Sequence, residues 1–289
     1  MFKSNFIKKI FIFVFLINII LCSQLYAKDK YTFAMLPQIT QNKVYASWKP
    51  VIEFLQKETG LTFDFIYPKN FEEHTKLCSE GKIDFAYSNP ITYIQFAAKK
   101  ERPKGHIVIA EAQSKNGFFG EFITRKDNDS IKSIKDIKGK KGWITGWDSA
   151  GGYVFQQAHS LDNGIDMKKD CEIKESPENK QEKVIMAVIS KTADFGCIRN
   201  GMRQKSMDIP GINDLKVLAE TSKYPEWLFS SNSQIPKDIA EKVQNALTKL
   251  PEDILKQAAL PGNIIKFTKK TDKDLDVIRK VADKTGIKY

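Results

Sequence analysis

The sequence alternates short apolar runs with amphipathic ones, which restricts the folds open to it. The first series of elements is expected as strands at 31–36, 61–67 and 83–87, with helices at 45–59 and 71–80. Two more apolar runs, 107–112 and 118–125, follow as strands. Strands that alternate with helices favour parallel pairing in a layered α/β unit.

The same pattern then starts again. A second series is expected as strands at 140–145, 171–174 and 193–198, with helices at 152–161 and 178–189. The two series share a phrase, GKIDFA at 81–86 and KTADFG at 191–196, which follows a helix in both. Two copies at this spacing favour two similar lobes rather than a solenoid.

The tail after residue 214 is too short for a third domain. It is expected as strands at 215–219 and 228–230 and helices at 238–250, 252–259 and 273–285. We predict that it returns to complete the first lobe, with crossovers near 112–118 and 208–216. The expected division is lobe I at 28–114 and 215–289, and lobe II at 115–214. Two crossovers form a hinge, and the cleft between the lobes is the natural ligand site.

The first 27 residues resemble a secretory signal peptide. Three lysines precede residues 10–22, a run of thirteen residues in which Asn18 is the only polar one. Ala27 supplies a small residue at the expected cleavage point, and this predicts export to the periplasm. A retained anchor and a lipid-modified Cys22 remain alternatives. No later run is apolar for long enough to cross a membrane.

The charge and the cysteines restrict the partners. The formal net charge of +11 falls to +8 without the leader lysines, and the remaining lysines are scattered beside acidic residues. This argues against nucleic acid and leaves a solvated surface or an anionic ligand. Cys78, Cys171 and Cys197 are too widely spaced for a disulfide framework, so buried thiols are expected. A Cys171–Cys197 bridge stays open.

The segment Gly146–Tyr153 is the strongest candidate for a binding turn. It follows a predicted strand and precedes a predicted helix, and its small residues allow an anion to approach the amides of the first helical turn. Ser149 adds a hydroxyl donor. The alternative is a tight capped turn without a ligand.

A matching turn in the first half begins at Tyr87, where Ser88 or Asn89 caps a helix that starts at Pro90. Ligands of open α/β sheets lie beyond the carboxyl ends of strands, so the two turns are expected to face each other. Several aromatic residues surround these turns and suggest cleft walls: Tyr45, Trp48, Tyr87, Tyr93, Trp147, Tyr153 and Trp227. Among them, Trp48 is expected in the core.

Catalysis finds little support. Ser149 and His159 suggest a hydrolase, but Trp147 stands where a nucleophile elbow needs glycine. The isolated histidines and dispersed cysteines show no metal-ligand spacing, and no phosphate loop occurs. We therefore predict no enzyme activity, no cofactor and no metal.

Several phrases occur together in a characteristic order. They are Gly81–Tyr87, Phe122–Asp127, Ile131–Lys140 and Ser149–Tyr153. In this order they resemble the phosphate/phosphite/phosphonate-binding proteins of ABC transporters. The resemblance implies an α/β, two-lobe type II periplasmic binding protein fold with a ligand cleft between the lobes. It also implies delivery of a small anion to a permease in the inner membrane, and we expect a monomer.

The turn departs from the pattern of this family. Members usually carry Ser-Thr-Ser-Gly, whereas this chain has Ser149-Ala150-Gly151-Gly152, with one hydroxyl where three are expected. Each missing hydrogen bond is worth about 0.5–1.5 kcal/mol. Relatives also place an acidic residue against an amino or protonated group, and Glu226 is the candidate here.

The expected site therefore joins both lobes. Its residues are Ser149, Ala150, Gly151, Gly152, Tyr153, Trp147 and Arg199 from lobe II, and Ser88, Asn89, Tyr93, Tyr45 and Glu226 from lobe I. Arg199 is the candidate clamp for an oxyanion, with a surface position as its alternative. Two other functions stay open: a sensing subunit for a membrane kinase, and a serine hydrolase built on Ser149.

Overall fold

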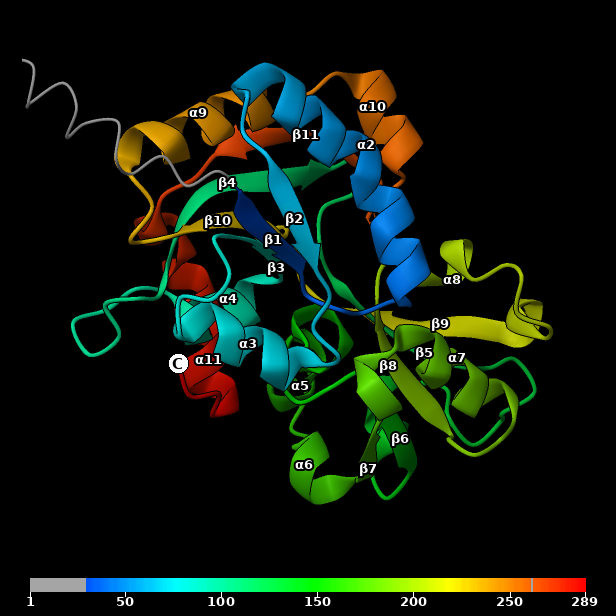
Figure 1. The fold of residues 1–289 in the computed structure, drawn as a ribbon. Helices are drawn as coiled ribbons and strands as arrows, with labels where there is room; N and C mark the ends of the chain where they lie inside the picture. The colour runs from blue at the N-terminus through cyan, green and yellow to red at the C-terminus, as the bar shows by residue number, and fades with distance from the viewer. Residues whose placement is uncertain (1–29, 261) are drawn as a thin grey trace, which may run out of the picture.

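Two β-sheets form the centres of two lobes in the computed structural model, which describes residues 30–260 and 262–289 (Figure 1). The predicted signal peptide and Cys22 lie outside these residues. Within the described ranges, no helix combines the length and the apolar character needed to cross a bilayer.

Lobe I is built on a six-stranded sheet in the order β11-β4-β10-β3-β1-β2. Its strands are β1 (Tyr31–Met35), β2 (Phe63–Ile66), β3 (Phe85–Ser88), β4 (His106–Ser114), β10 (Leu228–Asn232) and β11 (Ile264–Lys269). Strands β2, β1 and β3 are parallel as predicted, whereas β10 runs antiparallel to β3 and β4. Its helices are α2 (Gln41–Thr59), α3 (Phe71–Ser79), α4 (Pro90–Phe96), α9 (Lys237–Thr248), α10 (Glu252–Ala258) and α11 (Asp276–Thr285), with a 3-10 turn η5 (Asp272–Leu275).

Lobe II is built on a five-stranded sheet in the order β7-β6-β8-β5-β9. Its strands are β5 (Gly120–Arg125), β6 (Lys141–Ile144), β7 (Glu172–Glu175), β8 (Phe195–Arg199) and β9 (Leu215–Glu220). Its helices are α5 (Phe155–Asp162), α6 (Met167–Asp170), α7 (Gln181–Ile189) and α8 (Met202–Lys205). Short helical turns complete it: η1 (Ile134–Ile137), η2 (Ala150–Val154), η3 (Pro177–Asn179) and η4 (Ile212–Asp214).

The second crossover lies later than predicted. Strand β9 pairs antiparallel with β5 in lobe II, so residues 221–227 form the crossover rather than 208–216. Strand β11 was not predicted at all, because only Ile264 and Phe267 of its six residues are buried hydrophobics. An apolar pattern marks a strand, but it does not tell which sheet an edge strand joins.

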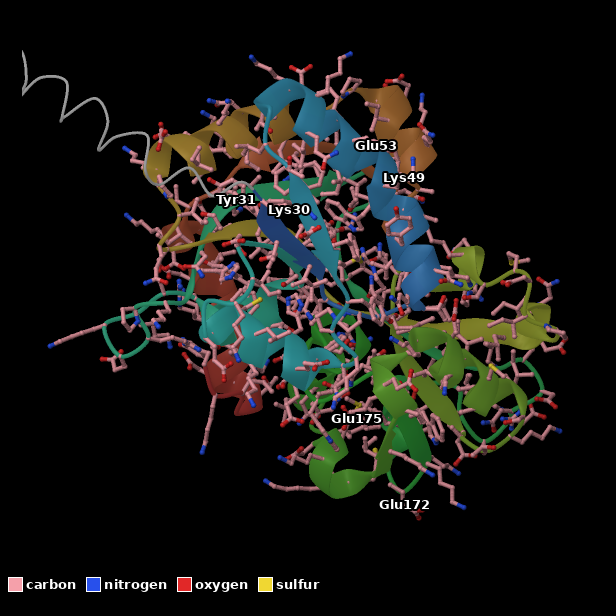
Figure 2. The ribbon with its side chains drawn as sticks, in the orientation of Figure 1. Lys30, Tyr31, Lys49, Glu53, Glu172 and Glu175 are labelled. Carbon is pink, nitrogen blue, oxygen red and sulfur yellow. The ribbon has the colours of Figure 1, made fainter. Side chains whose placement is uncertain are left out.

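Helix α2 shows how the sequence builds lobe I. Val44, Trp48, Val51 and Leu55 recur at helical spacing and are fully buried, which confirms the predicted core position of Trp48. The Trp48 ring lies 4.6 Å from that of Phe33 in β1. The opposite face is polar, and Figure 2 shows its Lys49 and Glu53 as a paired i,i+4 couple on the helix.

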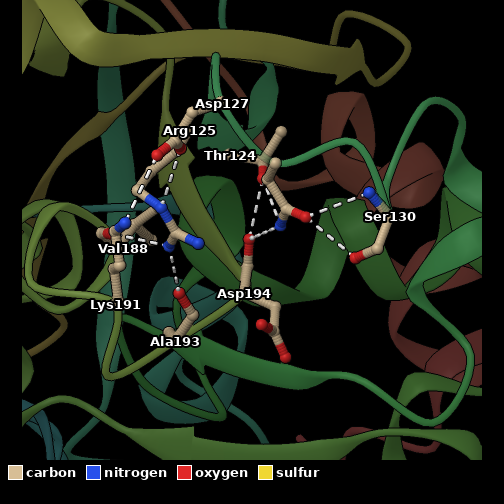
Figure 3. Close-up of polar contacts among 9 residues, drawn as sticks. Thr124, Arg125, Asp127, Ser130, Val188, Lys191, Ala193 and Asp194 are labelled. Carbon is tan, nitrogen blue, oxygen red and sulfur yellow. Dashed lines mark hydrogen bonds and ion pairs between the residues drawn. The ribbon is translucent and has the colours of Figure 1, made fainter.

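A cluster of polar contacts fastens β8 to β5 in lobe II (Figure 3). The Arg125 guanidinium donates to the carbonyl of Val188 in α7, at 3.0 Å, and to that of Ala193 just before β8, at 3.2 Å. The hydroxyl of Thr124 donates to the Asp194 carbonyl at 2.8 Å. These bonds fix the start of β8, and the other end of β8 carries Arg199.

The cysteines of the described residues are free thiols. Cys78 and Cys197 are buried as predicted, whereas Cys171 is half-buried, and its thiol donates to the Ile137 carbonyl. The bridge between Cys171 and Cys197 that the sequence left open is therefore not formed. Burial raises the pKa of Cys171 to about 11, which makes it a weak nucleophile.

Two buried histidines predict acid sensitivity of lobe I. Burial lowers the pKa of His74 to about 3 and that of His106 to about 4, from an ordinary 6.5. Below pH 6.5 the unfolded chain therefore binds more protons than the folded protein does. The contribution of these neutral histidines to the free energy of unfolding is present in full above this pH and is lost as the pH falls. Urea unfolding should show a lower free energy of unfolding at pH 5 than at pH 7. His74→Gln should flatten this dependence. Equal stability of the wild type at both pH values would contradict the argument.

Candidate functional site

The turn after β6 lies at the junction of the two lobes. The η2 segment contacts α4 and α11 of lobe I, and the Thr92 hydroxyl donates to the Asp148 carbonyl at 3.4 Å. Ser149 is only 4% exposed, and the next residues of the turn are buried as well. The lobes are thus closed over the turn that the sequence singled out.

The turn carries amides without intrahelical acceptors. Its first helical bond runs from the Val154 amide to the Ser149 carbonyl, at 3.0 Å, so the amides of residues 150–153 precede the helical ladder. The helix dipole makes this end electropositive. The Ser149 side chain forms no capping bond and keeps its hydroxyl for another partner.

Close packing explains the two glycines of the turn. A Cβ atom at Gly152 would lie 2.2 Å from the Thr145 hydroxyl oxygen. At Gly151 it would lie 2.7 Å from the Phe118 ring and 2.8 Å from the Arg199 Cβ atom. The turn is therefore pressed against β6, the first crossover and Arg199.

The side chains predicted from lobe I already have partners inside that lobe. The Ser88 hydroxyl bonds to His74 Nε2 at 2.7 Å, and Asn89 caps α4 by accepting from the Thr92 amide at 2.9 Å. The Tyr93 hydroxyl accepts from the Val108 amide at 2.9 Å and donates to Asp272. The cap confirms the predicted role of Asn89 at the helix start, but it occupies the group that was expected to meet a ligand.

Two of the aromatic residues that were expected to wall the cleft, Tyr45 and Trp147, lie apart. Tyr45 is 52% exposed on α2, where its ring meets that of Phe65, so it does not wall the closed junction. Trp147 packs edge-on against Tyr153, with ring centroids 4.9 Å apart. Trp147 and Asp148 line a cavity of about 540 Å³ between the lobes, together with Asn70, Phe71, Glu72, Glu175, Ser176, Glu178 and Asn179.

Arg199 and Glu226 form a buried ion pair beside the hinge. Arg199 is 1% exposed, which rules out the surface alternative, and its Nη2 lies 3.1 Å from Glu226 Oε1. The guanidinium lies over the Phe118 ring, 4.6 Å from its centroid. Glu226 Oε1 also accepts from the Trp227 amide. Burial raises the pKa of Glu226 and Arg199 opposes the rise, so this carboxylate is compensated within the protein and is not free for a ligand amine.

A run of contacts between the lobes was not anticipated from the sequence. Lys180 of lobe II is 4% exposed and donates to the carbonyls of Pro37 and Ile39, at 3.0 and 3.2 Å, and to the Tyr67 hydroxyl, at 2.9 Å. Its neighbour Gln181 donates to the Gln38 side chain at 2.7 Å. Nothing in the sequence distinguished Lys180 from the other lysines.

The hydrolase alternative fails on geometry. His159 lies ten residues after Ser149 along η2 and α5, which places it about 15 Å further along the helix axis. Its ring packs against Phe122 of β5. Ser149 and His159 therefore do not form a nucleophile and base pair. Within the described residues, no three or more His, Cys, Asp and Glu side chains are grouped to hold a metal ion.

Two α/β lobes, two crossovers and a buried junction between them define a periplasmic binding protein fold. The structure superimposes on PhnD1 from Prochlorococcus marinus, solved in complex with methylphosphonate, with a TM-score of 0.79 and 16% identity over 90% of this chain and 99% of that one. It superimposes on a binding protein component of an ABC phosphonate transporter from Pseudomonas aeruginosa with a TM-score of 0.77 and 16% identity, over 90% and 87% of the two chains.

The sequence narrows this class to one family. Residues 33–275 match the model of the family described as ABC transporter, phosphonate, periplasmic substrate-binding protein. A curated relative, the phosphate-import protein PhnD of Mycolicibacterium smegmatis, is 23% identical over 278 residues, which cover 88% of this chain and 85% of the relative. The chain belongs to the family of periplasmic substrate-binding proteins of phosphonate ABC transporters.

Proposed function

We propose that this protein holds a small phosphorus oxyanion between its lobes, at the turn of Ser149 to Gly152, and delivers it to the permease of an ABC importer. The chain acts as a monomer in the periplasm after cleavage behind Ala27. It performs no chemistry on the ligand. Closure of the lobes excludes water and matches hydrogen-bond donors to the oxygens.

One observation carries the proposal. The amides of residues 150–153 have no intrahelical acceptor, yet the turn is buried where the lobes meet. Buried amides require a partner, and the positive end of a helix favours an anion. The Ser149 hydroxyl, the amides of Gly151 and Gly152 and those of the flanking Ala150 and Tyr153 surround the place of the anion. The methylphosphonate bound to the Prochlorococcus relative indicates the kind of probe to use.

Thermal unfolding of the purified protein with a panel of anions tests the proposal. Phosphate, phosphite, methylphosphonate, sulfate and nitrate are each added in the same excess. A ligand at about 100 times its dissociation constant stabilises the fold by about 2.7 kcal/mol, which gives a clear rise in the unfolding midpoint. We expect this rise with a phosphorus oxyanion. In Ser149→Ala we expect weaker binding by about tenfold and an unchanged midpoint without ligand, because Ser149 caps no helix.

A matched control lies further along the chain, in α5. Ser160 is buried in α5, and its hydroxyl has no partner among the described residues. Ser160→Ala should therefore keep both the midpoint and the affinity. Absence of a shift with every phosphorus oxyanion, or equal losses in Ser149→Ala and Ser160→Ala, would refute the assignment of the turn.

A further inference from the structure

Four buried side chains beside the turn carry hydrogen-bond donors without acceptors. Four of their polar groups have no hydrogen-bond partner in the described part of the chain: Gln38 Nε2, the Tyr87 hydroxyl, Arg199 Nε and Trp227 Nε1. Each of these residues is at most 2% exposed. A buried donor without a partner costs about 1–3 kcal/mol, so four at one place indicate that something else supplies the acceptors.

These four residues come together although the sequence separates them widely. Trp227 directly precedes β10, whose antiparallel pairing with β3 sets Leu228 opposite Ser88 and brings Trp227 to the carboxyl end of β3, beside Tyr87. The rings of Tyr87 and Trp227 have centroids 5.2 Å apart, and the Arg199 guanidinium carbon lies 5.9 Å from the Trp227 ring. We call Gln38, Tyr87, Arg199 and Trp227 the hinge-side wall.

The hinge-side wall adjoins the anion turn. Gln38 joins it through Gln181, which donates to the Gln38 side-chain oxygen and accepts from the Arg199 amide at 2.8 Å. The Arg199 Cβ atom lies 2.8 Å from the place of a Cβ on Gly151. A ligand held by the amides of the turn therefore lies next to these side chains.

Each unpaired group of the wall can donate a hydrogen bond. Trp227 Nε1 and Arg199 Nε can only donate, and Gln38 has its oxygen already engaged by Gln181. The nearest carboxylates are also engaged, Glu226 by Arg199 and the Trp227 amide, and Glu111 by Lys270 and the Glu226 amide. Among the four unpaired groups, only the Tyr87 hydroxyl can also accept, so the wall offers a ligand mainly donors.

We infer that the hinge-side wall is the second half of the ligand site, with Tyr87 and Trp227 as specificity-determining contacts for a group that presents mainly acceptor oxygens. This rests on the proposed function of the turn. The wall supplies the side-chain donors that the turn lacks at Ala150. The ligand group that it recognises is an oxyanion, such as the head of a phosphonate.

Two aromatic substitutions test the inference. Tyr87→Phe removes only a hydroxyl without a partner, and Trp227→Phe removes the indole N–H together with part of the ring. We expect each to weaken methylphosphonate binding by about 10- to 100-fold in isothermal titration calorimetry, since each donor meets a charged acceptor. In Tyr87→Phe the unfolding midpoint without ligand should stay the same or rise, whereas a purely structural role of the hydroxyl would lower it.

The control is Tyr31→Phe, at the amino end of β1 and thus at the far end of the sheet from the wall. It should bind methylphosphonate as the wild type does. If the wild type binds methylphosphonate and both Tyr87→Phe and Trp227→Phe bind it with an affinity within about twofold of the wild type, the inference is overturned. The turn alone then remains as the site. Absence of binding in the wild type would instead refute the proposed function, and the inference about the hinge-side wall would be refuted with it.

Discussion

Replacing Arg199 by methionine is expected to lower the free energy of unfolding by about 3–5 kcal/mol, because it leaves a buried carboxylate without its cation. Arg199 and Glu226 are both nearly inaccessible to solvent, and the bonds from Nη2 to the two carboxylate oxygens measure 3.1 and 3.3 Å. Methionine fills a similar volume, so the loss comes from the charge rather than from a cavity. Urea unfolding at pH 7.5 measures it.

The double variant separates the charge from the packing. Arg199→Met with Glu226→Gln removes both charges and should recover most of the lost stability. The deficit of the single variant should also shrink at low pH. Burial already raises the pKa of Glu226, and without Arg199 the folded state holds its proton more strongly than the unfolded chain, so stability falls as the pH rises.

An arginine whose carboxylate partners are exposed provides the comparison for this result. Arg279 pairs with Asp272 and Asp276 at 2.6 and 2.9 Å, but both carboxylates are more than half exposed. Arg279→Met should therefore cost less than about 1 kcal/mol. Losses of equal size for Arg199 and Arg279 would mean that the buried pair is no more than a packing contact.

The elements that the sequence predicted well are those that short-range signals define. Helix α2 combines four apolar residues at helical spacing with Gly60, which ends it at a φ of 67° and donates to the Gln56 carbonyl. The phrases at 81–86 and 191–196 both lead into buried strands, β3 and β8. The turn at Ser149 follows from the strand before it and the helix after it.

Features that depend on distant partners could not be predicted in this way. The place of β9 in lobe II depends on its pairing with β5, almost one hundred residues earlier. The hydroxyl of Tyr93 looked suited to a ligand, but the Val108 amide and Asp272 occupy it. Glu226 resembled a receptor for a ligand amine until Arg199 was found beside it. The type of a side chain identifies it as a candidate for ligand binding. Only the tertiary contacts determine whether its polar groups are free to bind a ligand.

Lys180 is another residue whose role depends on distant partners. Its replacement is the second change for which we expect a large effect. Its ammonium group crosses from lobe II to three oxygens of lobe I, and no carboxylate of the described residues lies within ion-pair distance of it. The adjoining residues Glu178 and Asn179 both have a φ of 57°, an uncommon conformation that helps to direct this segment across the junction. The contact exists only when the lobes are closed, so it stabilises closure rather than either lobe.

We therefore expect Lys180→Met to shift the protein toward an open form. Closure would leave the carbonyls of Pro37 and Ile39 and the Tyr67 hydroxyl without their donor, and a less populated closed form lowers the apparent affinity in proportion. Methylphosphonate should bind about 10- to 100-fold more weakly in calorimetry, and small-angle scattering of the ligand-free protein should give a larger radius of gyration.

Lys43→Met is the matched control, since Lys43 also crosses the junction, to Glu182 at 2.6 Å, but is half exposed. The affinity of this variant should fall by less than about fivefold. Equal affinity in Lys180→Met and the wild type would mean that ligand binding alone closes the lobes and that the Lys180 contacts do not stabilise the closed form.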